Sequence, residues 1–205
     1  MNKYIMEFIG TFFLVLAIGL AVPNAGNMAP IAIGAVLIGM IYAGGHISMA
    51  HYNPAVTIAF WLRKRFPVSE IAPYVGAQVV AAVLAALTAQ FLGGGGSNPE
   101  QVEIVPALLA EFLFTFALAF VILNVATSKN TAGNDSYAVA IGMVVIGGAY
   151  TVGSISGAVF NPAVAIGASL MGLLNWADIW LYMVANFAGG ALAGVTFLFL
   201  NPDDH

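Results

Sequence analysis

Six long apolar stretches constrain the fold of this 205-residue chain more than any other feature of its sequence. A helix that crosses the hydrocarbon core of a bilayer needs about 20 apolar residues. The stretches that meet this need are residues 5–22, 31–50, 71–92, 105–127, 137–152 and 177–200. Two further apolar segments, 54–62 and 162–171, are too short to span a bilayer and too apolar for surface loops. We therefore predict an all-α membrane protein, a single transmembrane domain over residues 1–205 with six spanning helices and two re-entrant half-helices.

The composition excludes several other classes of protein. Apolar residues make up 61% of the chain and charged residues only 7%, whereas soluble domains carry about 25% charged residues. A net charge of -4 argues against a nucleic-acid partner, since phosphate contacts need a basic surface. Runs such as residues 81–87 do not alternate in polarity, as the strands of a membrane barrel would. The chain has no cysteine and no nucleotide or cofactor motif, so we expect neither an enzyme nor a cofactor.

The positive charges predict how the chain is oriented. Cytoplasmic loops of membrane proteins carry an excess of Lys and Arg. With six spans and the N-terminus inside, all five cations fall on the cytoplasmic side, and so do both chain termini; the cations are Lys3, Arg63, Lys64, Arg65 and Lys129. Glu100 and Glu103 then lie outside. The length of the chain and its minimal tails favour the plasma membrane of a prokaryote.

The chain contains an internal repeat. Residues 45–56 align with residues 153–164 at an offset of 108, and residues 74–78 align with 182–186 at the same offset. At an offset of 104, the segment that begins at Glu7 matches the segment that begins at Glu111. We predict a first repeat over 1–92, a connecting loop over 93–104 and a second repeat over 105–205. Because each repeat has three spans, the second enters the membrane from the opposite side, and the two half-helices meet near the midplane.

Each half-helix begins with the motif Asn-Pro-Ala, at Asn53, Pro54 and Ala55 and again at Asn161, Pro162 and Ala163. Asparagine is a good N-cap, and proline suits the first helical position because no amide donor is needed there. Two helix N-termini that meet at the membrane centre create a positive potential hostile to cations and protons. The backbone before each Asn is expected to be non-helical and to present a ladder of carbonyl acceptors. The ladder comprises Met49, Ala50 and His51 from one side and Ser156, Gly157, Ala158 and Val159 from the other.

These motifs resemble the major intrinsic protein family, the aquaporins and glycerol facilitators. The matching pieces are Glu-Phe-Ile-Gly-Thr at 7–11, Gly-His-Ile-Ser at 45–48, the first Asn-Pro-Ala with its flanks at 51–57, Gln78, Glu111, and Ile-Ser-Gly at 155–157 before the second Asn-Pro-Ala. The resemblance implies a right-handed bundle in membrane lipids, one pore in each protomer and a homotetramer. It implies a passive channel for water or small uncharged solutes. It also implies that Glu7 and Glu111 accept hydrogen bonds from the non-helical backbone.

The resemblance assigns roles to two histidines. His46 would lie along the cytoplasmic part of the pore, and His51 would support the loop before the first Asn-Pro-Ala. The two are five residues apart without a third histidine or a nearby carboxylate, so we predict no metal site.

One departure from the family concerns the outer constriction of the pore. Most relatives follow the second Asn-Pro-Ala with Arg, whereas this chain has Val164. Family spacing places Ile33, Ala149 and Ala158 at the other constriction positions, so the whole set is apolar. Such a neck either admits small neutral solutes or closes by dewetting. Two alternatives stay open: an ion- or proton-coupled secondary transporter using Glu7 and Glu111, and a structural family member that conducts nothing.

Overall fold

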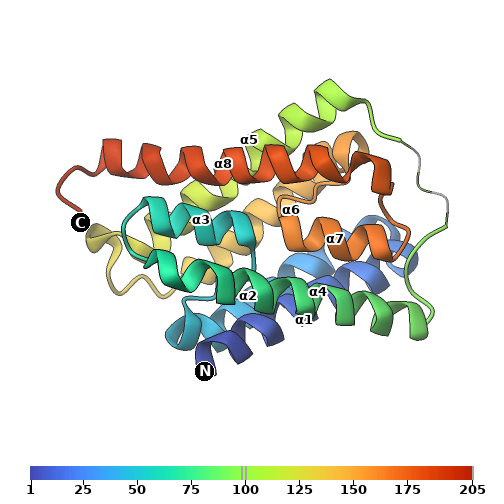
Figure 1. Ribbon diagram of the computed structural model, residues 1–205, viewed down its shortest axis with the longest axis horizontal. Coiled ribbons are helices and arrows are strands. Elements are labelled where there is room, and N and C mark those ends of the chain that lie inside the picture. Colours follow the sequence, from blue (N-terminus) through green and yellow to red (C-terminus); the bar gives the residue numbers. More distant parts are fainter. Residues whose placement is uncertain (98, 100, 205) are drawn as a thin grey trace.

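The computed structural model describes residues 1–97, 99 and 101–204, and this part of the chain contains eight α-helices and no strand (Figure 1). Six of the helices are long and apolar enough to cross a membrane, which confirms the predicted fold class. The helices are α1 (Asn2–Asn24), α2 (Ala29–Ser48), α3 (Pro54–Leu62), α4 (Ile71–Phe91), α5 (Ile104–Thr127), α6 (Tyr137–Ser156), α7 (Pro162–Leu170) and α8 (Ile179–Leu200). The predicted connecting segment 93–104 includes residue 98 and Glu100, which lie outside the described residues.

The helix ends differ from the predicted ones by a few residues, with one physical cause at α2 and α6. Both helices end where the next residue adopts a left-handed conformation, Met49 with φ +66° and Gly157 with φ +85°. This conformation closes a helix because the amide of the left-handed residue bonds back to the last turn. The sequence prediction ended the second of these helices at residue 152, before the run Gly153 to Ser156. Those residues continue α6 as a regular helix.

The two half-helices lie end to end between α4 and α8, and their N-termini face each other in the middle of the molecule (Figure 1). Each is nine residues long, and each begins at the proline of an Asn-Pro-Ala motif. The Asn53 side chain accepts a hydrogen bond from Ala55 N, and the Asn161 side chain accepts bonds from Ala163 N and Val164 N. Each asparagine therefore caps its own half-helix.

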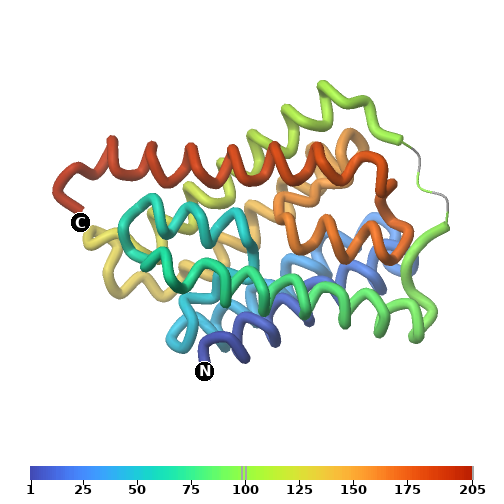
Figure 2. Tube along the Cα trace, viewed as in Figure 1, coloured from blue at the N-terminus to red at the C-terminus, as the bar shows by residue number. Residues whose placement is uncertain are grey.

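Packing between helices follows the sequence repeat. In the first half α1 packs against α2 and α4, and in the second half α5 packs against α6 and α8. The half-helices exchange partners, because α3 packs on α8 and α7 packs on α4. Figure 2 shows both chain ends toward the same end of the molecule, while α4 ends and α5 begins toward the other.

Glycines let α2 and α6 cross closely at the interface between the halves. The side chain of Ile146 lies over Gly34, and the side chain of Ile38 lies over Gly142. A Cβ atom at either glycine would collide with the isoleucine of the other helix. The two contacts are related by the offset of 108, so the crossing has approximate two-fold symmetry.

The outer surface of the bundle is apolar. Phe91 is 89% exposed, Phe199 is 83% exposed and Val105 is 75% exposed, and many other large apolar side chains point outward from the long helices. A protein surface of this kind is suited to lipid tails rather than water. The chain is therefore a multi-pass membrane protein.

A buried ion pair ties down the segment after α8. Arg63 is fully buried just after α3. Its guanidinium donates to Asp204 Oδ1 over 3.0 Å and to the carbonyl of Thr127 over 2.8 Å. The guanidinium also lies 4.3 Å from the centre of the Phe197 ring. Asp204 Oδ2 also accepts a hydrogen bond from Lys129 N over 2.8 Å. Burial by itself would raise the pKa of Asp204, but these donors together hold its pKa well below the ordinary value.

We expect Asp204→Asn to destabilise the folded protein by about 1.5–3 kcal/mol at neutral pH, the range for hydrogen bonds to charged groups. A depressed pKa means that the folded state takes up the proton less readily than the unfolded chain. The contribution of Asp204 is therefore present above the ordinary aspartate pKa of about 4 and is lost as the pH falls further. Thermal unfolding in detergent should show a gap between wild type and variant that narrows below this pH. The exposed neighbour Asp203, changed to Asn, is the matched control. A gap that stays constant as the pH falls would contradict the role of the carboxylate.

Candidate pore

The backbone before each Asn-Pro-Ala motif is non-helical and strongly bent. Ala50 and Tyr52 adopt positive φ angles of +49°, and Ala158 and Phe160 adopt +54° and +52°. None of the four is a glycine, although positive φ disfavours residues with a Cβ. Such conformations persist only where the surroundings hold them in place.

A buried carboxylate holds the first of these bends. Glu7 on α1 is fully buried, and its two oxygens accept hydrogen bonds from Ser48 Oγ over 2.7 Å, from His51 N over 2.9 Å and from Tyr52 N over 2.7 Å. The amide of Gln78 on α4 donates a fourth bond over 2.8 Å. The carboxylate thereby satisfies backbone amides that have no helical partner.

Glu111 on α5 holds the second bend in the same way. It accepts from Ser156 Oγ over 2.7 Å, from Val159 N over 2.8 Å and from Phe160 N over 2.7 Å. The side-chain amide of Asn186 on α8, oriented with its nitrogen toward Glu111, donates over 3.0 Å, and its oxygen accepts from Asn161 N. The two carboxylates therefore have equivalent partners in the two halves.

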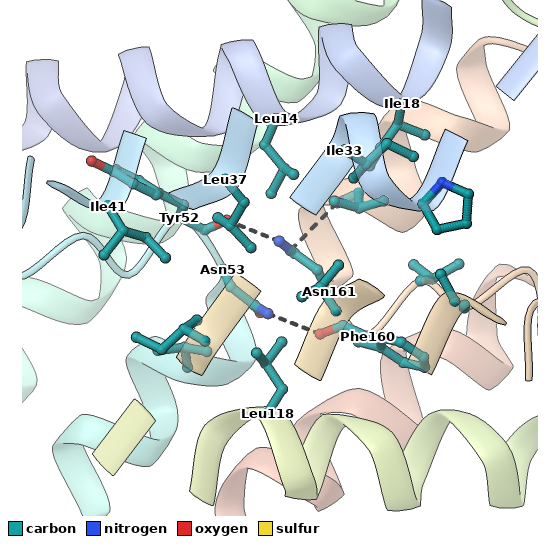
Figure 3. A pocket seen from close by; sticks show the side chains of 18 of the residues that line it. Leu14, Ile18, Ile33, Leu37, Ile41, Tyr52, Asn53, Leu118, Phe160 and Asn161 are labelled. Carbon is teal, nitrogen blue, oxygen red and sulfur yellow. Dashed lines mark hydrogen bonds between the residues drawn. The ribbon is translucent and has the colours of Figure 1, made fainter. Parts of the chain in front are cut away.

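The two asparagines cross-link the halves at the centre. Asn53 Nδ2 donates to the carbonyl of Phe160 over 2.8 Å, and Asn161 Nδ2 donates to the carbonyl of Tyr52 over 2.9 Å (Figure 3). A side-chain amide carries two N–H groups. Each asparagine therefore keeps a second N–H for another acceptor after it has reached the opposite loop.

A cavity of about 320 Å³ runs past these asparagines between the two halves. Figure 3 places Asn53 and Asn161 between two groups of apolar side chains, with Ile41 toward one side and Ile33 and Ile18 toward the other. All four predicted constriction residues line it, namely Ile33, Ala149, Ala158 and Val164. Six of the seven predicted ladder residues also line it: Met49, Ala50, His51, Gly157, Ala158 and Val159.

Two predicted positions are not among the residues that line this cavity. Ser156 does not line the cavity, since its hydroxyl bonds Glu111 and its carbonyl accepts from Tyr182 over 2.7 Å. His46 is exposed and does not line the cavity either. The buried face of α2 includes Ile41, Gly44 and Ser48, and a residue two positions from Ser48 is rotated by about 200° around the helix, away from that face.

His51 is buried beside the cavity and packs against Phe60, Phe66 and Tyr74. Its Nδ1 lies 3.2 Å from Thr57 Oγ1, which fixes the ring. Its Nε2 has no hydrogen-bond partner among the described residues.

Sequence reasoning missed part of the central arrangement. The carbonyl acceptors for the two asparagines belong to Tyr52 and Phe160, which directly precede the motifs and match in the repeat alignment. Tyr74 and Tyr182 also match in the alignment, and their hydroxyls donate to the carbonyls of Ser48 and Ser156. The alignment could have identified these positions as structural, although it could not have identified their partners.

The comparisons with known proteins agree on one family. The family model described as Major intrinsic protein matches residues 1–197. The chain is 36% identical to probable aquaporin NIP4-2 from Arabidopsis thaliana, over 99% of this chain and 76% of the relative. It is 34% identical to aquaporin Z from Rhodopseudomonas palustris, over 98% of this chain and 94% of the relative. The X-ray structure of the aquaglyceroporin from Plasmodium falciparum superposes with a TM-score of 0.81 at 20% identity, covering 96% of this chain and 94% of the other, which shows a shared fold.

We expect Glu111→Gln to destabilise the protein strongly. The amide would turn an N–H toward a group of four donors, and leaving a buried polar group unsatisfied costs about 1–3 kcal/mol. Thermal unfolding and gel filtration in detergent measure the effect. Glu103→Gln is the control, because Glu103 is exposed at the start of the same helix. Equal stability of the two variants would contradict the structural role of the buried carboxylate.

Proposed function

Because the chain belongs to the major intrinsic protein family, whose members are membrane channels for water or small solutes, we propose that it conducts small uncharged molecules passively through the cavity between its two halves. It is a channel protein and not an enzyme. The observation that carries the proposal is the placement of Asn53 and Asn161. Their side chains reach across to the opposite loops at the facing N-termini of α3 and α7, inside the cavity.

The facing helix ends supply the basis for excluding ions. Each N-terminus carries a partial positive charge of about half an elementary charge, and the two add where they meet. A cation or a hydronium ion entering between them meets an unfavourable potential. A neutral molecule can instead accept the free N–H of either asparagine and donate to the carbonyls of the bent segments. The chemistry of the site therefore selects neutral hydrogen-bonding permeants.

The apolar outer constriction bears on the size of the permeant. Val164 occupies the position that the resemblance assigns to an arginine, and Ala149 and Ala158 are small. No side chain of this set carries a charge or donates a hydrogen bond. We infer that solutes larger than water, such as urea and glycerol, pass the outer constriction.

We propose that the end of the molecule with both chain termini faces the cytoplasm. Lys3 forms an ion pair with Glu70 just before α4, and Arg63 and Arg65 pair with Asp204 after α8. The cations therefore gather where the chain begins and ends, as the excess of positive charge on cytoplasmic loops requires. From here on, the mouth on this side is the inner mouth and the opposite one is the outer mouth.

We also propose a homotetramer in which each chain has its own cavity, as the family resemblance implies. The apolar residues that cover the outer surface provide for contact with neighbouring copies and with lipid.

Stopped-flow light scattering of proteoliposomes tests the channel proposal. We expect vesicles with the protein to re-swell faster than empty vesicles of the same lipid in urea and glycerol gradients. The rate should neither saturate with solute concentration nor change with a proton gradient, because nothing in a passive pore is coupled to protons. Absence of flux above empty vesicles for water, urea and glycerol would defeat the proposal. Saturating, proton-dependent flux would favour the secondary transporter.

We expect Val164→Arg to reduce urea and glycerol permeability by about fivefold or more, and water permeability less, because a long cation narrows the outer constriction and leaves room only for the smallest permeant. The same vesicle assay measures all three rates. Val164→Leu adds bulk without charge or donors and should have a smaller effect. An increase in solute permeability of the Arg variant would contradict the expectation that the arginine side chain narrows the pore at this position.

A further inference from the structure

The repeat relates the two mouths of the cavity residue by residue. Four pairs of lining residues are identical at the offset of 108. These pairs are Ile33 with Ile141, Ala50 with Ala158, Asn53 with Asn161 and Val56 with Val164. A difference between the mouths therefore comes from pairs that are not identical, or from a lining residue such as Leu174, which lies over Gly157 and whose partner does not line the cavity.

Three such pairs differ in the same direction. At the outer mouth the lining residues are Ala29, Ala149 and Gly157, and their partners at the inner mouth are Tyr137, Ile41 and Met49. In each pair the larger side chain is on the inner side. One pair, related by the offset of 104, has its larger side chain at the outer mouth. Val22 at the outer mouth corresponds to Ala126 at the inner mouth, and the two side chains differ by only two carbon atoms.

Met49 occupies its position against the preference of the backbone. Its φ of +66° is left-handed, and its repeat partner in the same conformation is a glycine. A left-handed residue with a Cβ costs about 1–2 kcal/mol. A strained residue that persists at a cavity mouth points to a function for its side chain.

Tyr137 is held in place at the same mouth. Its ring packs edge-on against Tyr42 with centroids 5.5 Å apart, and its hydroxyl lies against Gly45, where any side chain would collide with it. Ile41 is 4% exposed and lies on the opposite side of the asparagine pair from Ile33 (Figure 3).

The inner mouth is also a boundary between two cavities. A second cavity of about 680 Å³ lies beyond it, lined by Arg65 and by the segment between α5 and α6. Met49, Ala126 and Tyr137 line both cavities. The pore cavity therefore meets a second, larger cavity at these three residues, of which Met49 and Tyr137 have large side chains.

We propose that Ile41, Met49 and Tyr137 form the constriction that limits the size of the permeant, so that the selective neck of this channel lies at its inner mouth and not at the predicted outer constriction. The inference rests on the proposed function, because it names the residues that set its specificity. The neck is apolar except for the Tyr137 hydroxyl, so a solute sheds most of its water there, and the penalty grows with the number of its hydroxyl groups. Small neutral solutes therefore pass more readily than polyols.

Replacing each neck residue by its repeat partner tests the proposal. The variants Ile41→Ala, Met49→Gly and Tyr137→Ala give these three inner positions the residues of their outer-mouth partners. Met49→Gly also relieves the positive φ, so it should fold at least as stably as the wild type. Permeability to water, urea, glycerol and a four-carbon polyol is measured in proteoliposomes.

We expect each of the three variants to raise glycerol permeability by about threefold or more and to admit the four-carbon polyol, with little change in water permeability. The reason is that widening the neck lowers the permeation barrier most for the largest solutes. Ile47→Ala is the matched control, since Ile47 lies on the same helix as Ile41 and points outward with 43% exposure. Ile33→Ala at the outer mouth should raise solute permeability less than Ile41→Ala does.

Two sets of outcomes separate this inference from the proposed function. Conduction by the wild type with no gain from the three inner variants, or a larger gain from Ile33→Ala, would overturn the inference and leave the channel proposal standing. A silent wild type together with conducting inner variants would defeat the proposed conduction by the wild type and support the neck as the closed point of the pore. If neither wild type nor any variant conducts, both the channel proposal and the neck fall.

Discussion

The hydrogen bonds that two buried carboxylates accept from bent backbone are the constraint on which the rest of this structure depends. A lipid-embedded chain has no water to satisfy backbone amides outside helices, and each unsatisfied group costs several kcal/mol. Glu7 and Glu111 each take two consecutive amides and a serine hydroxyl. With the amides turned toward the carboxylates, the carbonyls of Tyr52 and Phe160 are available to the asparagines of the opposite half. The pore therefore depends on two acids that do not line it.

The cross-links between the halves make the centre a shared element. Asn53 caps α3 and donates to the second loop, while Asn161 caps α7 and donates to the first. Neither asparagine has all its partners until both bent segments are formed. The close crossing of α2 and α6 brings the halves together at the matching depth, because the isoleucine of each helix occupies the space left by a glycine of the other.

Hydropathy and motif spacing predicted the spanning helices, the half-helices and the caps at Asn53 and Asn161, because each of these depends on neighbouring residues. They did not predict which face of a helix points inward. Helices that are apolar on every side have no polar stripe to mark the exposed face. The family resemblance placed His46 along the pore, whereas His46 is exposed and is not among the residues that line the cavity. The sequence likewise identified Arg63 only as one of the positive charges that indicate the cytoplasmic side. Its pairing with Asp204, 141 residues away, depends on tertiary structure that local sequence does not contain.

The residues that match between the halves and the residues that differ have separate tasks. Glu7, Ser48 and Tyr74 have exact chemical partners in the second half, and all of them hold backbone. The pairs Ile41 with Ala149 and Met49 with Gly157 differ, and all four residues line the cavity. A duplicated scaffold thus carries an asymmetric lining without loss of its hydrogen bonds. In a passive channel such asymmetry cannot give net transport in one direction, since at equal concentrations the two fluxes must balance. What it can set is where along the path a solute meets its largest barrier, and therefore which solutes pass.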